Sequence, residues 1–462
     1  PLRQRYAAGD IYREMVSEYE NSIPDDLDLS EVLREVAIFH QEAADYSSAE
    51  PLIRQRLAME EEWGPDDLEA ADSLNSLAQL LQATGRIAEA EEKFRRVAAI
   101  RERSFGGRDP ELATALNNLA VLLAENGRVD EAEPLMRRAL SLREAASGPR
   151  HLEVARCLNN LAQLLRSSSR LADAEPLMRR ALTIDQESLG PDHPNVARDL
   201  HNLASLLMVS NRLAEAEPLM RRALAIDEQR SGPDHPSVAR ILNNLAQLLQ
   251  ASDRLTEAEP IMRRALEIDE KCFGRDNPSI VLRVNNLAGL LQKLNRLTEA
   301  EPLILRALQI AEQNLGPRHP TTALCLSNLA NVCFKTNRHG EAELLFRRVL
   351  GIDEQRFGLN HLEVSADLNN LAQVLFATHK ISEIEPLLRR SMEILLRFRR
   401  ESGVEHPSLP TVVAFYLGVS VQCLGMMPRQ ALIEVHELFE AEGLTDLLRD
   451  ILDRLPGASE TH

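Results

Sequence analysis

The feature that most constrains this chain is a 42-residue unit that returns along most of its 462 residues. One copy opens with Asn-Asn-Leu-Ala at residues 243–246, continues with Glu-Ala-Glu-Pro at 257–260 and reaches Arg-Arg-Ala-Leu at 263–266. The equivalent copies begin at Asn117, Asn159, His201, Asn285, Ser327 and Asn369. A repeat of this length is typical of solenoids, in which one small unit stacks on the next. The sequence therefore predicts an array of one repeated unit.

Within a unit, the apolar residues are spaced as on two helices. In the copy around residue 203, the first helix carries Leu200, Leu203, Ala204 and Leu207, which recur at i, i+3, i+4 and i+7. The second helix carries Leu213, Ala216, Met220, Ala223 and Leu224 at helical spacing. Only a short break at residues 211–212 separates them, so the two helices are expected to form a hairpin. Each hairpin keeps apolar surface that the next hairpin must cover.

These residues resemble the tetratricopeptide repeat, because Leu203, Ala204, Ala216 and Ala223 occupy the small and apolar signature positions of that family. The usual repeat has about 34 residues. The longer unit, with Leu-Asn-Asn-Leu-Ala, Glu-Ala-Glu-Pro-Leu and Leu-Gly-Pro-Asp-His-Pro, is similar to the repeat domain of kinesin light chains and related bacterial proteins. The resemblance implies an all-α, right-handed superhelical solenoid of stacked antiparallel helix pairs.

The repeat pattern predicts three parts of the chain. Residues 1–29 are expected to form an N-terminal capping helix and a linker, and residues 30–402 nine helix pairs, of which the first is degenerate. Residues 403–462 are expected to form a degenerate tenth repeat, a C-terminal capping helix and a tail. Terminal repeats are often atypical, since their outer side must meet water.

The junctions between repeats share one sequence logic. A Gly such as Gly190 is expected to end the second helix in the left-handed conformation. A polar residue then stands where the next first helix starts, namely Asp67, Asp109, His151, His193, His235, Asn277, His319 and His361. The five histidines could form a metal ladder or cap helices. Capping is favoured, because Asp and Asn take the same position and equivalent residues of stacked repeats lie too far apart to share one ion.

Composition excludes several classes of function. The net charge of −18 argues against binding nucleic acid, which needs a basic surface. The Arg-Arg pairs follow a Glu four residues earlier, as Arg137 follows Glu133, and so predict an internally paired outer face.

Five cysteines without a Cys-x-x-Cys pair suit buried thiols in a reducing, cytoplasmic setting. No apolar run reaches the length of a membrane span. No catalytic motif stands in the sequence, so we expect no enzyme activity, cofactor or metal site.

The face of the first helices that borders the core stripe is expected to line the concave side of the solenoid, and we call it the inner face. In repeats four to eight, the charged residues of this face are seven cations and one acid. The cations are Arg156, Arg166, Arg198, Arg240, Arg283, Lys293 and Lys335, and the acid is Asp199. In so acidic a chain this asymmetry predicts a groove for an acidic ligand. The candidate groove residues are Asn118, Arg156, Asn160, Gln163, Arg198, Asn202, Arg240, Asn244, Gln247, Asn286, Lys293, Asn328, Lys335 and Asn370.

An asparagine amide both donates and accepts hydrogen bonds, so a row of them suits an extended peptide backbone of any sequence. The resemblance implies that the second Asn of each repeat contacts bound peptide. The first hypothesis is a protein-interaction scaffold that binds an extended, acidic peptide or protein segment. The second is the sensor or regulatory arm of a larger effector, such as an NTPase or protease, fused before Pro1 or assembled in trans.

Overall fold

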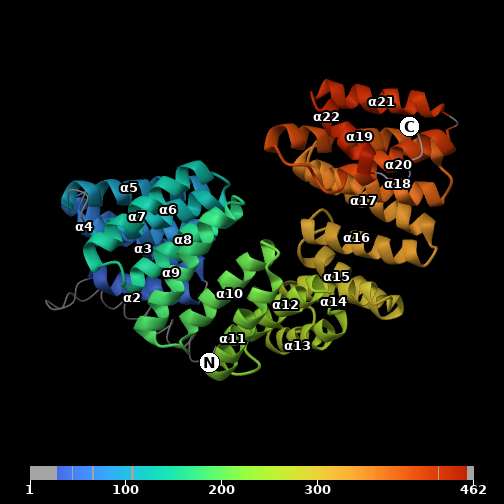
Figure 1. Cartoon of the computed structure of the whole chain (residues 1–462). Coiled ribbons are helices and arrows are strands. Elements are labelled where there is room, and N and C mark those ends of the chain that lie inside the picture. Colours follow the sequence, from blue (N-terminus) through green and yellow to red (C-terminus); the bar gives the residue numbers. More distant parts are fainter. Residues whose placement is uncertain (1–28, 44, 65–66, 106–108, 425, 455–462) are drawn as a thin grey trace. The chain divides into compact units, whose positions relative to one another are not determined.

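The computed structural model describes residues 29–43, 45–64, 67–105, 109–424 and 426–454. This part of the chain contains 21 α-helices, one 3-10 turn and no β-strand (Figure 1). The capping helix expected before residue 29 and the tail after residue 454 lie outside the described residues. The all-α prediction is confirmed.

In the described residues the α-helices follow one another through short connections, with one 3-10 turn between α13 and α14. They are α2 (Leu29–Glu42), α3 (Tyr46–Trp63), α4 (Leu68–Ala83), α5 (Ile87–Phe105), α6 (Pro110–Glu125), α7 (Val129–Ser147), α8 (Leu152–Ser167), α9 (Leu171–Leu189), α10 (Pro194–Val209), α11 (Leu213–Ser231), α12 (Pro236–Ala251), α13 (Leu255–Phe273), the 3-10 turn η1 (Pro278–Ile280), α14 (Val281–Lys293), α15 (Leu297–Asn314), α16 (Pro320–Lys335), α17 (His339–Phe357), α18 (Leu362–Ala377), α19 (Ile381–Ser402), α20 (Leu409–Gln422), α21 (Pro428–Ala441) and α22 (Thr445–Arg454).

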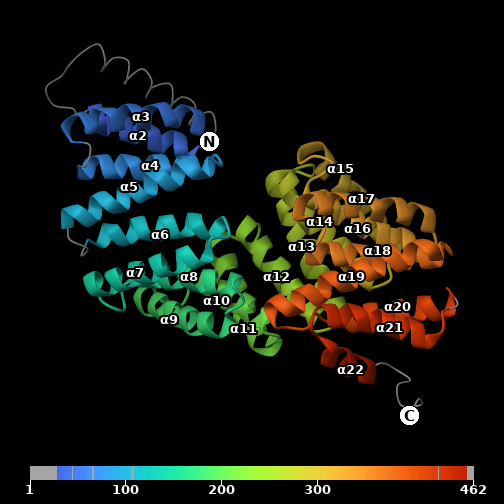
Figure 2. The same ribbon diagram turned by 90° about the horizontal axis from the view of Figure 1, so that it is seen from above.

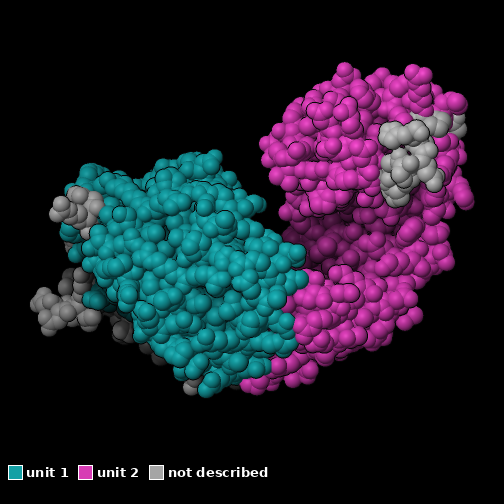
Figure 3. Space-filling view, viewed as in Figure 1, with its two compact units in different colours: residues 1–230 teal, residues 231–462 magenta. Residues whose placement is uncertain are grey.

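The chain divides into two compact units, residues 1–230 and residues 231–462 (Figure 3). We call them unit 1 and unit 2 and describe each by itself. In both units a 16-residue first helix, such as α8, is followed by a longer second helix, such as α9 with 19 residues. The two helices run antiparallel because only three residues connect them, and the pairs stack in chain order (Figures 1 and 2). The predicted helix-pair solenoid is confirmed.

The small residues of the repeat lie where the two helices of a pair touch. Ala204 on the first helix of one pair and Ala216 and Ala223 on the second are all completely buried, as is Leu203. Side chains of this size let helices approach closely. Three of the five cysteines are buried as expected, but Cys272 and Cys423 are exposed, so the prediction of buried thiols is wrong for these two.

The turn within each helix pair depends on one residue in the left-handed conformation. Asn211 has φ 57°, and the equivalent Ser169, Asp253, Asn295, Asn337 and His379 have φ between 58° and 60°. Gly190, at the junction between repeats, also has positive φ, but its ψ of 161° is extended. The predicted left-handed conformation of Gly190 is therefore wrong: its φ is positive as expected, but its ψ is extended. This backbone still favours Gly, because positive φ is costly for other residues.

The histidines at the starts of first helices are helix caps, as predicted. In α10, Nδ1 of His193 accepts the backbone N–H of Asn195 at 3.1 Å. The same cap bond starts α8, α12, α16 and α18 with His151, His235, His319 and His361. Asp109 and Asn277 do the same with a side-chain oxygen. Each cap satisfies one of the N–H groups that a helix start leaves unpaired.

The outer face carries a regular set of ion pairs between neighbouring second helices. Arg137 pairs with Glu133 of its own helix at 2.7 Å, and Arg170 reaches the same Glu133 from the next repeat at 2.7 Å. Arg180 pairs with Glu144 of the preceding repeat at 2.7 Å and donates to the Pro149 carbonyl in the loop at 2.9 Å. The prediction of an internally paired outer face is confirmed.

Candidate functional site

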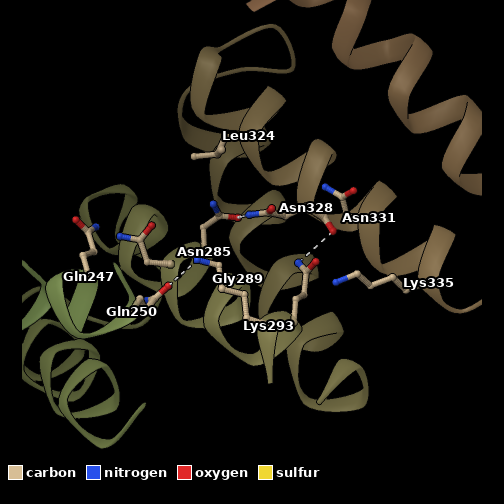
Figure 4. Close-up of a pocket in the computed structure, with 11 residues that line it drawn as sticks. Gln247, Gln250, Asn285, Gly289, Lys293, Leu324, Asn328, Asn331 and Lys335 are labelled. Carbon is tan, nitrogen blue, oxygen red and sulfur yellow. Dashed lines mark hydrogen bonds between the residues drawn. The ribbon is translucent and has the colours of Figure 1, made fainter. Parts of the chain in front are cut away.

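The inner face of unit 2 contains a cavity of about 460 Å³ between three successive first helices, α12, α14 and α16 (Figure 4). It is lined by Gln247, Gln250, Asn285, Asn286, Gly289, Gln292, Lys293, Leu324, Asn328, Asn331 and Lys335. Five of the predicted groove residues therefore meet at one place: Gln247, Asn286, Lys293, Asn328 and Lys335.

The chemistry of this cavity is amide-rich and cationic. Seven of its eleven lining side chains are Asn or Gln, two are Lys, and none is a carboxylate. Lys293 donates to Oε1 of Gln250 at 3.3 Å. Lys335 is exposed and forms no ion pair with any described residue. In a chain of net charge −18, the cavity thus presents two positive charges that no lining acid neutralises.

Asparagines join successive first helices by side-chain hydrogen bonds, which we call rungs. In unit 2, Asn286 on α14 donates to Asn243 on α12 at 3.1 Å, and Asn328 on α16 donates to Asn285 on α14 at 2.9 Å. In both of these rungs the acceptor is the buried first Asn of a repeat and the donor is the half-buried second Asn of the next. A donor amide keeps one N–H and its carbonyl oxygen for other partners.

Unit 1 has the same rungs and one interruption. Asn118 donates to Asn75 at 3.1 Å, and Asn160 donates to Asn117 at 2.9 Å. The next rung would join Asn202 to Asn159. Instead Asn159 donates to the buried Asp199 at 2.8 Å, and its own Oδ1 has no hydrogen-bond partner in the described structure.

A second, smaller cavity of about 290 Å³ lies on the inner face of unit 1, and it includes Asn160 and Gln163 of α8. Its lining also includes Glu125, so it lacks the purely cationic character of the cavity in unit 2. The other predicted groove residues, Asn118, Arg156, Arg198, Asn202, Arg240, Asn244 and Asn370, lie on first helices outside these two cavities.

Two of the predicted groove cations are neutralised within unit 1. Arg156 forms an ion pair with Glu153 one turn earlier on α8. Arg198 pairs with Asp185 at 3.2 Å and with Asp199 at 3.1 Å. In unit 2, Arg240 is exposed and has no ion pair with another described residue of that unit. Among the predicted groove residues, the cations without an ion pair to a described residue of their own unit are therefore Arg240, Lys293 and Lys335, on α12, α14 and α16.

The structure corrects the placement of two charges that sequence analysis assigned to the inner face. Asp199 is 1% exposed, and the half-buried Arg283 forms an ion pair with the buried Asp269. Each of the two residues directly follows an exposed residue of its first helix. Because successive residues of an α-helix are rotated by about 100° about the helix axis, the two side chains point toward the preceding second helix. Burial raises the pKa of Asp199 to about 6, although the charge of Arg198 opposes this rise.

The cavity in unit 2 is also lined by residues that were not predicted to line a groove, namely Gln250, Asn285, Gly289, Gln292 and Leu324. Gln250 and Gln292 are equivalent positions of adjacent repeats, 42 residues apart, so the period itself could have indicated them. Leu324 is 43% exposed, and its repeat equivalent Leu282 is 52% exposed, where earlier repeats have Arg156, Arg198 and Arg240.

The family model for the tetratricopeptide repeat matches residues 28–103, 69–145, 111–187, 168–228, 200–271 and 280–355. Together these segments cover more than half of the chain. The chain belongs to the tetratricopeptide repeat family. Tetratricopeptide repeat proteins are generally protein-interaction scaffolds and are typically not enzymes.

Several solved structures resemble this tetratricopeptide repeat protein. A variant of a Podosopora anserina putative kinesin light chain with nearly identical TPR-like repeats has 23% identity and a TM-score of 0.41, over 45% of this chain and 97% of that one. BtubC (BKLC) from P. vanneervenii has 21% identity and a TM-score of 0.42, over 52% and 93%. The apo form of the quorum sensor NprR from B. thuringiensis has 12% identity and a TM-score of 0.56, over 76% and 94%.

The likeness to NprR supports the helical repeat fold alone, because the sequences are only 12% identical. The sequence matches none of the curated proteins. Among the described helices of this tetratricopeptide repeat protein, none is both long and apolar enough to cross a membrane. The described residues also contain no group of three or more His, Cys, Asp or Glu side chains that could hold a metal ion.

Proposed function

We propose that this protein is an interaction scaffold that binds an extended, acidic peptide or protein segment on the inner face of unit 2. The cavity between α12, α14 and α16 carries the proposal, because it combines amides on three successive helices with two lysines and no acid. Lys293 and Lys335 would pair with ligand carboxylates. Amides such as Asn286 and Asn328 would bond the ligand backbone.

The rungs support a backbone-reading role for the asparagines. Asn286 and Asn328 are each held by one N–H to the preceding repeat, which fixes the direction of the amide before a ligand arrives. An amide held in this way loses less rotational freedom on binding than a free one. Since every peptide offers the same backbone groups, such amides give affinity without requiring a particular sequence.

The lysines supply the preference for acid. Lys293 and Lys335 are both exposed and lie at equivalent positions, at the ends of α14 and α16. Because each repeat contributes one such position, two carboxylates spaced along an extended segment can each meet one lysine. Exposed charges of this kind attract and orient a ligand more than they increase its affinity, and salt screens them.

Peptide selection followed by cross-linking tests the proposal. Random 12-residue peptides are selected on the full chain, and we expect the enriched peptides to be rich in Asp and Glu. A photo-crosslinking amino acid is then placed at Leu324, which lines the cavity, or at the similarly exposed Leu305 on α15 as a control. We expect cross-linking from position 324 and not from 305. Enrichment of neutral or basic peptides, or equal cross-linking from both positions, would contradict the proposal.

A further inference from the structure

One pair of positions recurs where a second helix packs on the first helix of the next repeat. Within unit 2 these pairs are Asp269 with Arg283, Ala311 with Cys325, and Asp353 with Asp367, each 42 residues from the last. Ala311 and Cys325 are both fully buried. The same place in the fold thus holds an ion pair, a neutral pair or two acids. The array itself does not require an acid pair there.

The α13–α14 junction holds opposite charges at this place, although Oδ1 of Asp269 has no hydrogen-bond partner among the described residues. Asp269 is 1% exposed, and Arg283 pairs with it and also donates to the backbone carbonyl of Ala239 at 3.2 Å. Opposite charges with extra hydrogen bonds compensate for much of the cost of burial.

The α17–α18 junction differs, because two carboxyl groups meet there without a cation. Asp367 of α18 is 7% exposed, and its carboxyl group lies close enough to that of Asp353 of α17 to share a proton with it. Its Oδ2 atom has no hydrogen-bond partner among the described residues. A hydrogen bond between two carboxyl groups requires that one of them carries a proton. Burial, followed by the charge of Asp353, raises the pKa of Asp367 to about 8.

The other charged groups around this pair do not neutralise it. Glu354 of α17 and Glu363 of α18 add negative charge near Asp367. From α19, Arg390 is bound to Glu354 at 2.5 Å and to the Leu359 carbonyl at 2.7 Å, so its guanidinium is already occupied. The buried Asp367 and the half-buried Asp353 can therefore stay in contact only while they share a proton.

We propose that the α17–α18 junction is a proton-controlled joint in the array. When Asp353 and Asp367 share one proton, a hydrogen bond between them joins the eighth helix pair (α16 and α17) to the ninth (α18 and α19). When that proton is lost to solvent, two like charges face each other, one of them on the buried Asp367, and the interface weakens. Because contacts in such an array run between neighbours, the weakening stays local to this junction. The inference does not depend on what the inner face binds.

The related acid pair in unit 1 is not proposed as a proton-controlled joint, because a cation lies beside it. Asp185 and Asp199 also face each other across a junction, between α9 and α10. Arg198 contacts both carboxylates, at 3.2 Å and 3.1 Å, and supplies the positive charge that Asp353 and Asp367 lack. The joint is therefore assigned to the α17–α18 junction.

The direction of the pH effect follows from proton linkage. A free Asp in the unfolded or opened chain loses its proton near pH 3.9. Between about pH 4 and pH 8 the closed junction therefore holds a proton that the open junction does not. Stability of the junction falls as pH rises through this window and levels off above it. One linked proton changes the opening equilibrium by up to about tenfold per pH unit.

Hydrogen exchange of the full chain, followed by mass spectrometry at pH 5 to 9, tests the joint. After correction for the intrinsic pH dependence of exchange, we expect opening of α18 to rise by up to about tenfold per unit up to pH 8. Helix α14, held by the Asp269–Arg283 pair, serves as the reference within the same molecule and should show no such rise. Equal pH dependence in α14 and α18 would overturn the proposal.

Two variants sharpen the test. Asp367→Asn keeps a hydrogen-bond donor but cannot ionise, so opening of α18 should become independent of pH. The matched variant, Asp269→Asn, should increase opening of α14 by a similar factor at every pH, since Arg283 stays charged throughout. A full pH slope in Asp367→Asn would overturn the proposal. The reference helix in the wild-type protein decides the matter if that variant does not fold.

Discussion

Asn328 on α16 donates its side-chain N–H to Oδ1 of Asn285 on α14 across 2.9 Å, and Asn285 is only 2% exposed. The bond joins two repeats and at the same time aims the half-exposed Asn328 amide at the cavity (Figure 4). A single pair of residues thus links the stability of the array to the shape of the candidate site. The same relationship holds between Asn286 and Asn243.

Loss of this rung should weaken the array measurably. We expect Asn328→Ala to lower the free energy of unfolding by about 1 kcal/mol, because it leaves the buried Asn285 oxygen without its donor. Asn370→Ala is the matched control, since Ser327 stands where its acceptor Asn would be. Urea unfolding should show the smaller loss for Asn370→Ala. Equal losses in the two variants would mean that the rung contributes nothing of its own.

The histidine caps should be replaceable by another capping residue. His193→Asn is expected to leave the melting temperature nearly unchanged, because Asn is itself a preferred cap. His193→Ala removes the acceptor of the Asn195 N–H and should cost about 1 kcal/mol. Thermal unfolding followed by circular dichroism distinguishes the two variants. A large loss in His193→Asn would show that the imidazole ring has a role beyond capping.

The buried hydroxyl of Tyr416 joins three helices at the C-terminal end. It donates to Glu434 of α21 at 2.7 Å and accepts from Arg389 of α19 at 3.1 Å, while the Tyr416 ring on α20 is fully buried. Tyr416→Phe should destabilise α20 and α21 by about 1–3 kcal/mol, because the charged partners stay and lose a contact. Hydrogen exchange of these helices measures the effect.

Tyr46→Phe is the control for this change, since the Tyr46 hydroxyl makes no hydrogen bond to another described residue. Protection of α20 and α21 that is the same in Tyr416→Phe and Tyr46→Phe would contradict the assignment.

Asp199 predicts a separate pH effect in unit 1. Burial raises the pKa of Asp199 to about 6, and that of an unfolded Asp is about 3.9. The folded state therefore holds more protons between these values, so stability falls as pH rises from about 4 to 6. We expect the wild-type protein to lose up to about 3 kcal/mol over this window relative to Asp199→Asn. An unchanged difference between the two proteins at pH 4 and 6.5 would exclude this titration.

The repeat period predicted most of the fold, because the same apolar and small residues return at every copy. Leu203, Ala204 and Ala216 could be placed in the core from spacing alone, and the structure confirms all three. The sequence predicted a short break at residues 211–212, but not that Asn211 would adopt the left-handed conformation there. Ser, Asp and His take the same position in other repeats, so no single residue type signals it.

The candidate site was predicted less completely, for a geometric reason. Asp199 and Arg283 stand one residue beyond exposed positions, and one residue of a helix decides between the inner face and a buried junction. Neither their ion pairs nor the rungs between asparagines can be inferred from one helix alone, since both depend on how successive repeats stack. The amide-rich character of the inner face was nevertheless evident from Asn286 and Asn328 and their equivalents.

The salt dependence of peptide affinity tests the account most directly. The most enriched acidic peptide is titrated against the full chain, the variant that combines Lys293→Gln with Lys335→Gln, and Lys271→Gln as a control. Lys271 is an exposed lysine on α13 that pairs with Glu267 outside the cavity. We expect the double variant to bind about fivefold to thirtyfold more weakly at low salt, from two exposed pairs of about 0.5–1 kcal/mol each, and to lose most of its salt dependence. Lys271→Gln should bind like the wild-type protein. An affinity and a salt dependence that are the same in all three proteins would contradict a cationic, amide-lined peptide site on α12, α14 and α16.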